Sequence, residues 1–306
     1  MRVAITLGHD QRRFAHQARW AEEAGFDAVS VGEHLFFHGP TPNAFVALAA
    51  AAGVTERIRL LSSLTIVPVY PVALLAKLAA TLDQVSNGRF DLGVGVGWEY
   101  PPEFVAAGVA LTERGARTDE ALRLLRPLLA GDTVSHTGRF AEIPGLRLRP
   151  PSAQRPGPPV WVGGRKGAAI RRAGQFGDVW LPYMYTPEAL ADSLRRVRAS
   201  AAEHGRPGDA VRGAIYCWGA LDADAAAARR QVVEVVSAVY QQDFAPLADR
   251  YLLHGDPKRV IQRLREYHDA GAREMVFTPA TGSAEHAERM LRLFADEVLG
   301  ELHGWA

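Results

Sequence analysis

The chain has 306 residues, of which 35 are lysine or arginine and 34 are aspartate or glutamate, so its formal net charge is +1. This balance excludes a protein that binds nucleic acid or anionic membranes through its overall field. Cys217 is the only cysteine, which excludes an internal disulfide or a cysteine-rich metal cluster and indicates a reducing compartment. The N-terminus lacks the apolar core of a signal peptide, and no segment approaches the roughly 18 apolar residues of a membrane span. We therefore expect a cytoplasmic protein.

Short apolar runs alternate along the chain with longer stretches of helical period, a pattern typical of βα units around a parallel sheet. The first helix is expected to begin near Asp10, a capping residue, and to stop at Gly25. The last one before the final strand begins at Asp256 and Pro257 and ends at Gly271. The expected strands are residues 2–7, 28–31, 58–64, 90–94, 159–162, 178–181, 213–218 and 274–278.

Eight strand and helix pairs in about 300 residues predict the α/β fold class, as a single (β/α)8 TIM barrel domain over residues 1–306. Two stretches break the alternation, residues 98–112 and residues 132–158. We expect both to be insertions at the C-terminal face, lying over the mouth of the barrel. Reacting groups in this fold sit where strands end, so the strand ends are the places to search.

The second strand runs directly into Glu33 and His34. A histidine at the catalytic rim can exchange protons near neutral pH, and an adjacent carboxylate could orient or charge it. The alternative is a hydrogen-bonded loop histidine.

Small polar residues replace branched apolar ones at the end of the third strand, from Ser62 to Thr65. Such a run can form a bulge. The bulge either presses backbone against a flat ring or only turns the chain.

The fourth strand runs out into Gly93, Gly95 and Gly97, followed by Trp98. Backbone without side chains could be the floor of a cofactor site, with the tryptophan as a wall. The alternative is a tight turn whose glycines serve packing alone.

The fifth strand ends at Gly163 and Gly164, and Arg165 and Lys166 lead into a helix. Unpaired amides at a helix start can bind a phosphate, and the two cations would strengthen such a site. A plain βα loop with two solvated cations is the alternative.

Other common chemistries find no support. There is no G-x-G-x-x-G that opens a helix after the first strand, which disfavours a nicotinamide Rossmann site. No G-x-S-x-G elbow and no paired-carboxylate spacing is found that would indicate a hydrolase. The histidines lack metal-ligand spacing, so we expect no metal.

Taken together, these residues resemble the luciferase-like monooxygenase superfamily, and within it the branch that uses the deazaflavin coenzyme F420. The resemblance spans most of the chain. The segments that carry it are residues 24–27, Glu33-His34, residues 80–83, 86–89 and 93–98, Glu103-Phe104, Arg117, Asp119-Glu120, residues 159–164, 171–173 and 177–180, and residues 255–257.

The resemblance implies a barrel, usually dimeric, with a flavin or deazaflavin at its mouth. Carried over by position, His34 corresponds to the proton-handling histidine and Glu33 to its acidic neighbour. Ser63 and Leu64 fall where many members have a non-proline cis peptide behind the ring. Residues expected to bind the cofactor are Ser63, Leu64, Thr65, Gly95, Gly97, Trp98, Gly163, Gly164 and Arg165.

The resemblance leaves the cofactor open between F420 and FMN. The glycine series favours F420, whereas Trp98 stands where some F420 dehydrogenases have a glutamate, with Glu99 and Glu103 nearby. We expect an F420-dependent oxidoreductase that transfers hydride to or from a small organic substrate, acting as a homodimer. The alternatives are a two-component monooxygenase that uses reduced FMN and a non-catalytic flavin or deazaflavin binding protein.

Overall fold

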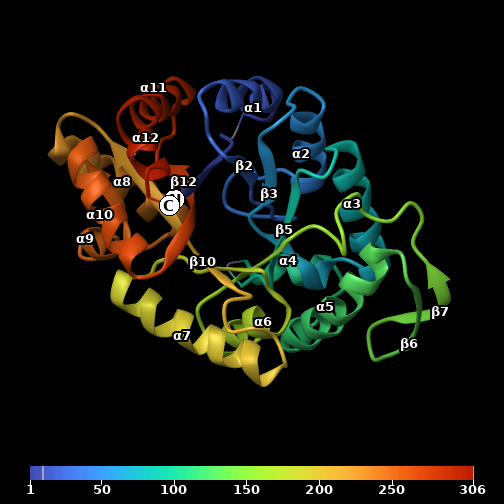
Figure 1. Cartoon of the computed structure of the whole chain (residues 1–306). Helices are drawn as coiled ribbons and strands as arrows, with labels where there is room; N and C mark the ends of the chain where they lie inside the picture. The colour runs from blue at the N-terminus through green and yellow to red at the C-terminus, as the bar shows by residue number, and fades with distance from the viewer. Residues whose placement is uncertain (9, 99, 306) are drawn as a thin grey trace.

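A parallel barrel organises the molecule, which we describe from a computed structural model covering residues 1–8, 10–98 and 100–305. Within these residues, eight strands close in sequence order, and helices surround them (Figure 1). The barrel strands are β1 (Arg2–Thr6), β2 (Ala28–Val31), β3 (Arg59–Ser62), β5 (Phe90–Gly95), β8 (Val160–Gly163), β9 (Val179–Leu181), β10 (Arg212–Leu221) and β12 (Ala272–Pro279). The predicted barrel is confirmed, and every predicted strand overlaps an observed one.

Helices follow most of the strands and cover the barrel. They are α1 (Phe14–Glu23), α2 (Ala44–Ala52), α3 (Val72–Val85), α4 (Pro101–Ala106), α5 (Arg114–Ala130), α6 (Gly167–Phe176), α7 (Pro187–Glu203), α8 (Ala225–Tyr240), α9 (Ala248–Tyr251), α10 (Pro257–Asp269), α11 (Ala284–Phe294) and α12 (Gly300–His303). None of the described helices is long and apolar enough to cross a membrane. Short 3-10 turns are η1 (Gln11–Arg13), η2 (Val67–Val69) and η3 (Leu111–Glu113), and a π-helical turn, η4 (Ala295–Leu299), joins α11 to α12.

Local sequence signals explain where the helices begin. The Asp256 carboxylate accepts a hydrogen bond from Arg259 N at 2.8 Å and caps α10, with Pro257 at its first position. Asp10 caps η1, which leads directly into α1, and Gly25 follows the end of α1 with φ +88°. The observed ends of α1 and the observed start of α10 agree with those predicted from the sequence.

The interior of the barrel is built in layers. Its middle is apolar and contains Ala4, Ala28, Leu61, Trp161, Val179, Leu181, Ala214 and Val276. Below this layer, towards the strand starts, inward-facing residues are charged, and above it, towards the strand ends, they are glycines and hydroxyl-bearing residues. We call the two ends the base and the mouth. The apolar layer separates the base from the mouth.

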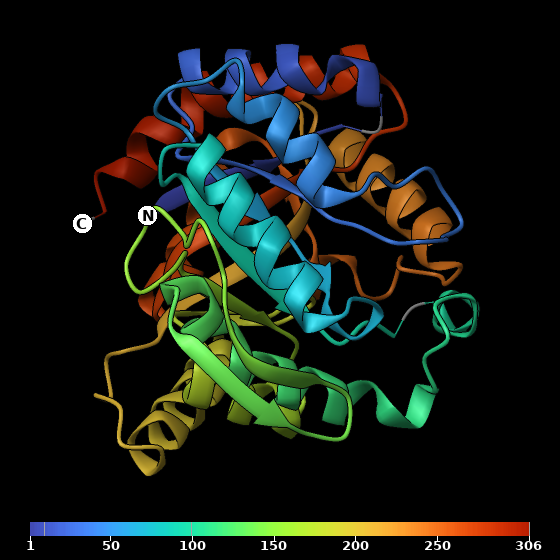
Figure 2. The same cartoon turned by 90° about the vertical axis from the view of Figure 1, so that its right-hand side faces the viewer.

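The described part of segment 98–112 contains α4 and η3 and projects from the mouth side, on the right in Figure 2. Residues 132–158 lie elsewhere than we expected. They form an antiparallel hairpin of β6 (Thr133–Thr137) and β7 (Glu142–Arg147) alongside α5, which Glu120 fastens by accepting from Ala141 N at 2.9 Å. Gln154 then donates to the carbonyl of Phe90, the first residue of β5, at 2.7 Å. This segment therefore runs along the barrel to its base rather than over the mouth.

Two short strands complete the sheet. Strand β4 (Thr65–Ile66) pairs with the end of β5, and β11 (Leu253–Gly255) pairs with the end of β10. The break between β3 and β4 falls at residues 63 and 64, where the sequence predicts an irregularity. This break is the centre of the candidate site.

Candidate active site

The chain turns at the end of β3 through a cis peptide between Ser63 and Leu64, which confirms the expectation from the family resemblance. Both residues are partly exposed at the mouth. The Ser63 and Thr65 hydroxyl oxygens are buried, and neither has a hydrogen-bond partner among the described residues. Buried hydroxyls are usually paired in proteins, so these two atoms mark a place where a ligand could supply partners.

The glycines of β5 make room for this turn. A Cβ on Gly93 would lie 1.9 Å from the Ser62 carbonyl oxygen, and one on Gly97 would lie 2.7 Å from a ring carbon of Phe104. Gly95 is looser, because its Cβ would lie 3.3 Å from the Leu64 side chain. Packing therefore accounts for Gly93 and Gly97, which was the alternative to a cofactor floor, whereas Gly95 stays partly exposed beside Leu64.

Glu33 faces away from His34, contrary to the expectation that it orients the imidazole. Its buried carboxylate accepts hydrogen bonds from Ala44 N at 3.1 Å, Ile66 N at 3.2 Å and the Tyr70 hydroxyl at 3.0 Å. Burial raises the pKa of Glu33, and these hydrogen bonds oppose the rise. Glu33 thus fastens the start of α2 to the β4 segment, and the carboxylate that contacts His34 comes from another element.

The carboxylate that holds His34 is Glu103, on α4. His34 Nδ1 lies 3.1 and 3.2 Å from the two Glu103 oxygens, and Leu35 N donates to the same carboxylate at 3.1 Å. Glu103 is fully buried, whereas the His34 side chain is 18% exposed. Phe37 stacks on the imidazole with ring centroids 4.2 Å apart. The structure therefore presents an oriented histidine at the mouth.

His34 lies next to the turn at Ser63. Ser63 N donates to the Val31 carbonyl at 2.8 Å, and a Cβ on Gly32 would lie 3.2 Å from the Ser63 carbonyl oxygen. The ends of β2 and β3 are therefore in contact, and the histidine follows two residues later. The segment that carries His34 therefore begins beside the turn at Ser63 and Leu64.

Trp98 stands exposed beyond β5, and the guanidinium of Arg114 lies 5.0 Å from its ring centroid. Arg114 also donates to the Gly97 carbonyl at 2.6 Å and contacts the Phe104 ring at 5.0 Å. This packing fixes the chain around Trp98. Glu99, which the sequence places next to Trp98, lies outside the described residues.

The end of β8 carries the predicted phosphate site. Gly163 and Gly164 are partly exposed, and Gly164 has φ +107°. The space of a Cβ on Gly163 is taken by the Leu64 side chain, at 1.9 Å, which links this strand end to the cis peptide. Arg165 is exposed, donates to the Met184 carbonyl at 3.1 Å and lies over the Tyr183 ring. Lys166 is exposed at the start of α6.

A row of hydroxyls that the sequence did not reveal crosses the interior just above the apolar layer. Ser30 and Thr6 are 3.0 Å apart, Thr6 and Thr278 are 2.7 Å apart, and Thr278 donates to the Tyr216 hydroxyl at 2.7 Å. These residues come from four strands, so no local pattern could group them. They give the mouth a polar floor on four neighbouring strands, β10, β12, β1 and β2.

The sequence matches the family of luciferase-like monooxygenases over residues 2–274. The chain belongs to this family. Among curated relatives of this luciferase-like protein, the uncharacterized protein Rv0940c of Mycobacterium tuberculosis is 34% identical over 209 residues, which cover 62% of this chain and 71% of that protein.

Two solved structures extend the likeness. Monooxygenase RslO1 from Streptomyces bottropensis superposes with a TM-score of 0.85 at 26% identity, covering 98% of this chain and 99% of its own. The coenzyme F420 dependent tetrahydromethanopterin reductase from Methanopyrus kandleri superposes with a TM-score of 0.83 at 20% identity, with the same coverage. The second likeness concerns the fold alone.

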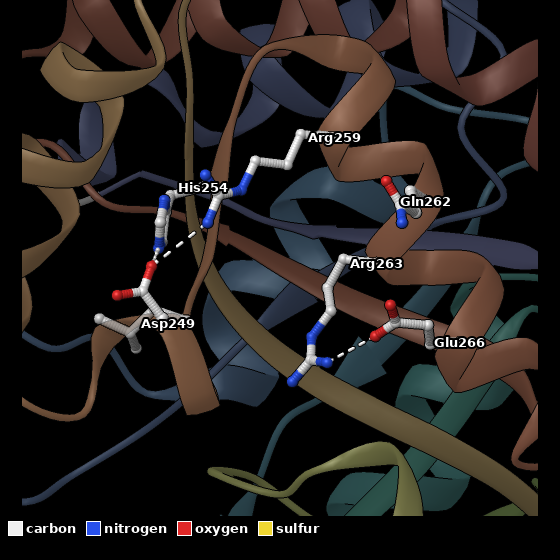
Figure 3. Close-up of a pocket in the computed structure, with 7 residues that line it drawn as sticks. Asp249, His254, Arg259, Gln262, Arg263 and Glu266 are labelled. Carbon is white, nitrogen blue, oxygen red and sulfur yellow. Dashed lines mark hydrogen bonds and ion pairs between the residues drawn. The ribbon is translucent and has the colours of Figure 1, made fainter.

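Two further cavities of this luciferase-like chain are lined by none of the predicted site residues. One, of about 210 Å³, is lined from α9 to α10 by charged side chains that already pair, including Asp249 with Arg259 at 3.2 Å and Arg263 with Glu266 (Figure 3). The other, of about 390 Å³, lies at the base around Met1 and Arg273. Neither places a candidate proton donor beside partly exposed backbone, as the mouth does.

Proposed function

We propose that this chain is an F420-dependent oxidoreductase that transfers hydride between the deazaflavin and a small organic substrate. The observation that carries the proposal is the pairing of an oriented, partly exposed histidine with the cis peptide at Ser63 and Leu64. His34 is held by a fully buried carboxylate, Glu103, at 3.1 Å. A proton donor fixed beside a flat, partly exposed stretch of backbone suits a reaction in which hydride and proton move separately.

The residues of the mouth fit a tricyclic ring with an anionic tail. Ser63 and Thr65 offer buried hydroxyls that have no partner among the described residues, and Leu64 and Gly95 offer a flat apolar surface. Gly163 and Gly164 would leave backbone amides for a phosphate, with Arg165 and Lys166 as neighbouring cations. When bound, the deazaflavin supplies a ring carbon that accepts or gives hydride.

His34 would hold and move the matching proton. Because Glu103 engages Nδ1, Nε2 is the ring nitrogen that is left to exchange a proton with a substrate. Glu103 positions the ring rather than reacting, since its carboxylate is fully buried and also accepts from Leu35 N. Phe37 restricts the imidazole from one side.

Titration of the purified protein with F420 and with FMN, each oxidised and reduced, tests the proposal. We expect F420 to bind at least tenfold more tightly than FMN, a difference of about 1.4 kcal/mol. Lys166→Glu should weaken F420 binding by about tenfold, and the loss should shrink at high salt. Arg230→Glu is the matched control, because Arg230 is 71% exposed on α8. Tighter binding of FMN would contradict the proposal.

The second candidate is a monooxygenase that uses reduced FMN. The Streptomyces bottropensis structure supports it, because a monooxygenase matches this chain at 26% identity, against 20% for the F420-dependent reductase. The requirement for oxygen distinguishes the two candidate functions. An F420-dependent oxidoreductase turns over its substrate under nitrogen, whereas a monooxygenase forms product only when oxygen is admitted.

A further inference from the structure

Large apolar side chains are exposed on the two loops that frame His34. Leu35, Phe36 and Trp98 are 47%, 57% and 68% exposed, and Val105 and Leu111 are also exposed in the second segment. Together they make up five of the nine exposed large hydrophobic residues in the described ranges. We call Leu35, Phe36 and Trp98 the lip. Exposed apolar side chains scattered singly need no explanation, but a concentration of them beside a candidate active site does.

The loops that carry the lip are fastened to each other and to the site. Leu35 N donates to Glu103, the residue that holds His34, and the His38 and Tyr100 rings meet edge to face with centroids 5.2 Å apart. Trp98 rests against Arg114. Both loops extend from the mouth side of the barrel (Figure 2). The lip is therefore presented by an ordered scaffold, next to the group that exchanges the proton.

The lip is also almost without charge. Residues 35–42 contain no aspartate, glutamate, lysine or arginine, although 23% of the chain is charged. In residues 98–112 the charged residues are Glu99, outside the described ranges, and Glu103, which is fully buried. The described loops of the lip thus offer apolar surface without exposed charges of their own, and the Arg114 guanidinium beside Trp98 already donates to the Gly97 carbonyl.

We propose that the lip binds the body of the substrate, and that this substrate is an uncharged, largely apolar compound with a planar or polycyclic skeleton. The inference rests on the proposed function, since it gives the substrate class of the same site. Rings would lie against Phe36 and Trp98 while the reacting group reaches His34.

Size favours such a compound over a second protein. Leu35, Phe36 and Trp98 together expose roughly 300 Å², if their exposed fractions are taken of the roughly 150–250 Å² that a large side chain offers. A stable protein interface needs about 800 Å² from each partner. An area of this size matches a drug-sized molecule instead.

Equilibrium dialysis of the full chain, with and without F420, against three probes tests the inference. We expect 2-naphthol, which is flat and uncharged at neutral pH, to bind at least tenfold more tightly than charged 2-naphthoate or small cyclohexanol. Phe36→Ser should weaken 2-naphthol binding about tenfold, and Trp98→Leu should weaken it less because it keeps an apolar side chain. Val46→Ser is the matched control, because Val46 is 72% exposed on α2 and should leave binding unchanged.

Equal binding of the three probes, or unchanged 2-naphthol binding by Phe36→Ser, would overturn the inference. So would a change in oligomeric state on Phe36→Ser by analytical ultracentrifugation, since the lip would then be an interface between copies. F420 affinity is measured on the same samples. If the protein prefers 2-naphthol but does not bind F420, the proposed cofactor is wrong and the proposed substrate site at the lip stands. If it binds F420 without this preference, only the proposed substrate site is wrong.

Discussion

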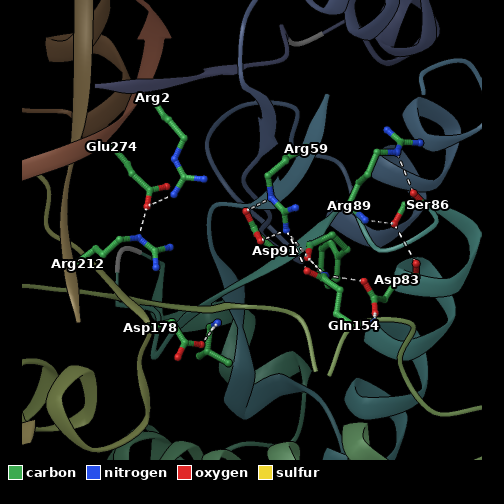
Figure 4. Close-up of polar contacts among 12 residues, drawn as sticks. Arg2, Arg59, Asp83, Ser86, Arg89, Asp91, Gln154, Asp178, Arg212 and Glu274 are labelled. Carbon is green, nitrogen blue, oxygen red and sulfur yellow. Dashed lines mark hydrogen bonds and ion pairs between the residues drawn. The ribbon is translucent and has the colours of Figure 1, made fainter. Parts of the chain in front are cut away.

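The two ends of the barrel use polar side chains in opposite ways. At the base, Glu274 accepts from Arg2 at 2.6 Å and from Arg212 at 2.8 Å, and Asp91 accepts from Arg59 at 3.0 Å (Figure 4). At the mouth, the hydroxyls of Ser63 and Thr65 have no partner in the described ranges, and apolar side chains are exposed. Both ends close the same eight strands. The difference agrees with the proposed function, because in this fold the mouth usually carries the reaction and the base usually provides stability.

Substitutions at the two ends should therefore separate activity from stability. The largest effect is expected at the mouth. His34→Gln keeps a polar amide of similar size but cannot exchange the proton, so turnover should fall by about 10²–10⁴. The thermal midpoint and F420 affinity should stay close to wild type. Turnover is followed by deazaflavin absorbance with a substrate from the uncharged apolar class.

Glu103→Gln supplies the contrast within the mouth. It should lower turnover less than His34→Gln, because the histidine remains and only its orientation is relaxed. If His34→Gln turned over as fast as wild type, the histidine would be a structural residue and the proton would come from another group.

The second prediction concerns the base. Asp91→Ala should lower the free energy of unfolding by about 3–5 kcal/mol, because it leaves the largely buried Arg59 guanidinium without a carboxylate and with only the Phe90 carbonyl and Gln154 as acceptors. F420 affinity should not change in the folded fraction. Denaturant unfolding followed by circular dichroism measures the loss.

The control for this prediction is Asp192→Ala on α7, which breaks an exposed ion pair with Arg195 and should change nothing measurable. A variant Asp91→Ala that lost F420 affinity while remaining as stable as wild type would contradict the division between base and mouth.

The barrel could be predicted from sequence because each strand is a local pattern, an apolar run bounded by turn residues. Gly163, Gly164 and the turn at Ser63 were found in the same way. The partner of His34 could not be predicted in this way, because Glu103 lies 69 residues away and only the tertiary fold brings the two together. The adjacent Glu33 was the wrong candidate, because its carboxylate is used by Ala44 N, Ile66 N and the Tyr70 hydroxyl.

The hairpin after α5 shows the same limit. Its residues were recognised as an interruption, but not its position, because Glu120 and Gln154 place it through contacts with α5 and β5. The row from Ser30 to Tyr216 was missed because its members are single polar residues in four separate strands. Local patterns identify elements, and contacts between distant elements decide which side chains meet.

The third prediction uses that hairpin, which belongs to neither end. Burial tends to raise the pKa of Glu120, but hydrogen bonds from Phe140 N, His136 and Ala141 N outweigh it and hold the pKa below its ordinary value. A carboxylate with a lowered pKa stabilises the fold above its unfolded pKa, near 4.3, and this contribution is lost as the pH falls through the folded value.

Glu120→Gln should therefore cost about 1.5–3 kcal/mol at neutral pH, the contribution of hydrogen bonds to a charged group. The difference from wild type should shrink as the pH falls from 5 towards 3. Thermal unfolding across this range measures it. A difference that stayed constant with pH would show that the ionised carboxylate is not what holds the hairpin.

The smallest effect is expected at Cys217, in the wall between the two ends. The thiol is buried, and burial raises its pKa to about 12, so it forms little thiolate while the barrel is closed. Iodoacetamide should therefore label it only when the barrel opens. Asp91→Ala, which weakens the base, should label faster than wild type, and His34→Gln, which alters the mouth, should label at the wild-type rate. Faster labelling of His34→Gln would mean that residues of the mouth also hold the barrel closed. Both ends would then stabilise the barrel, and not only the ion pairs of the base.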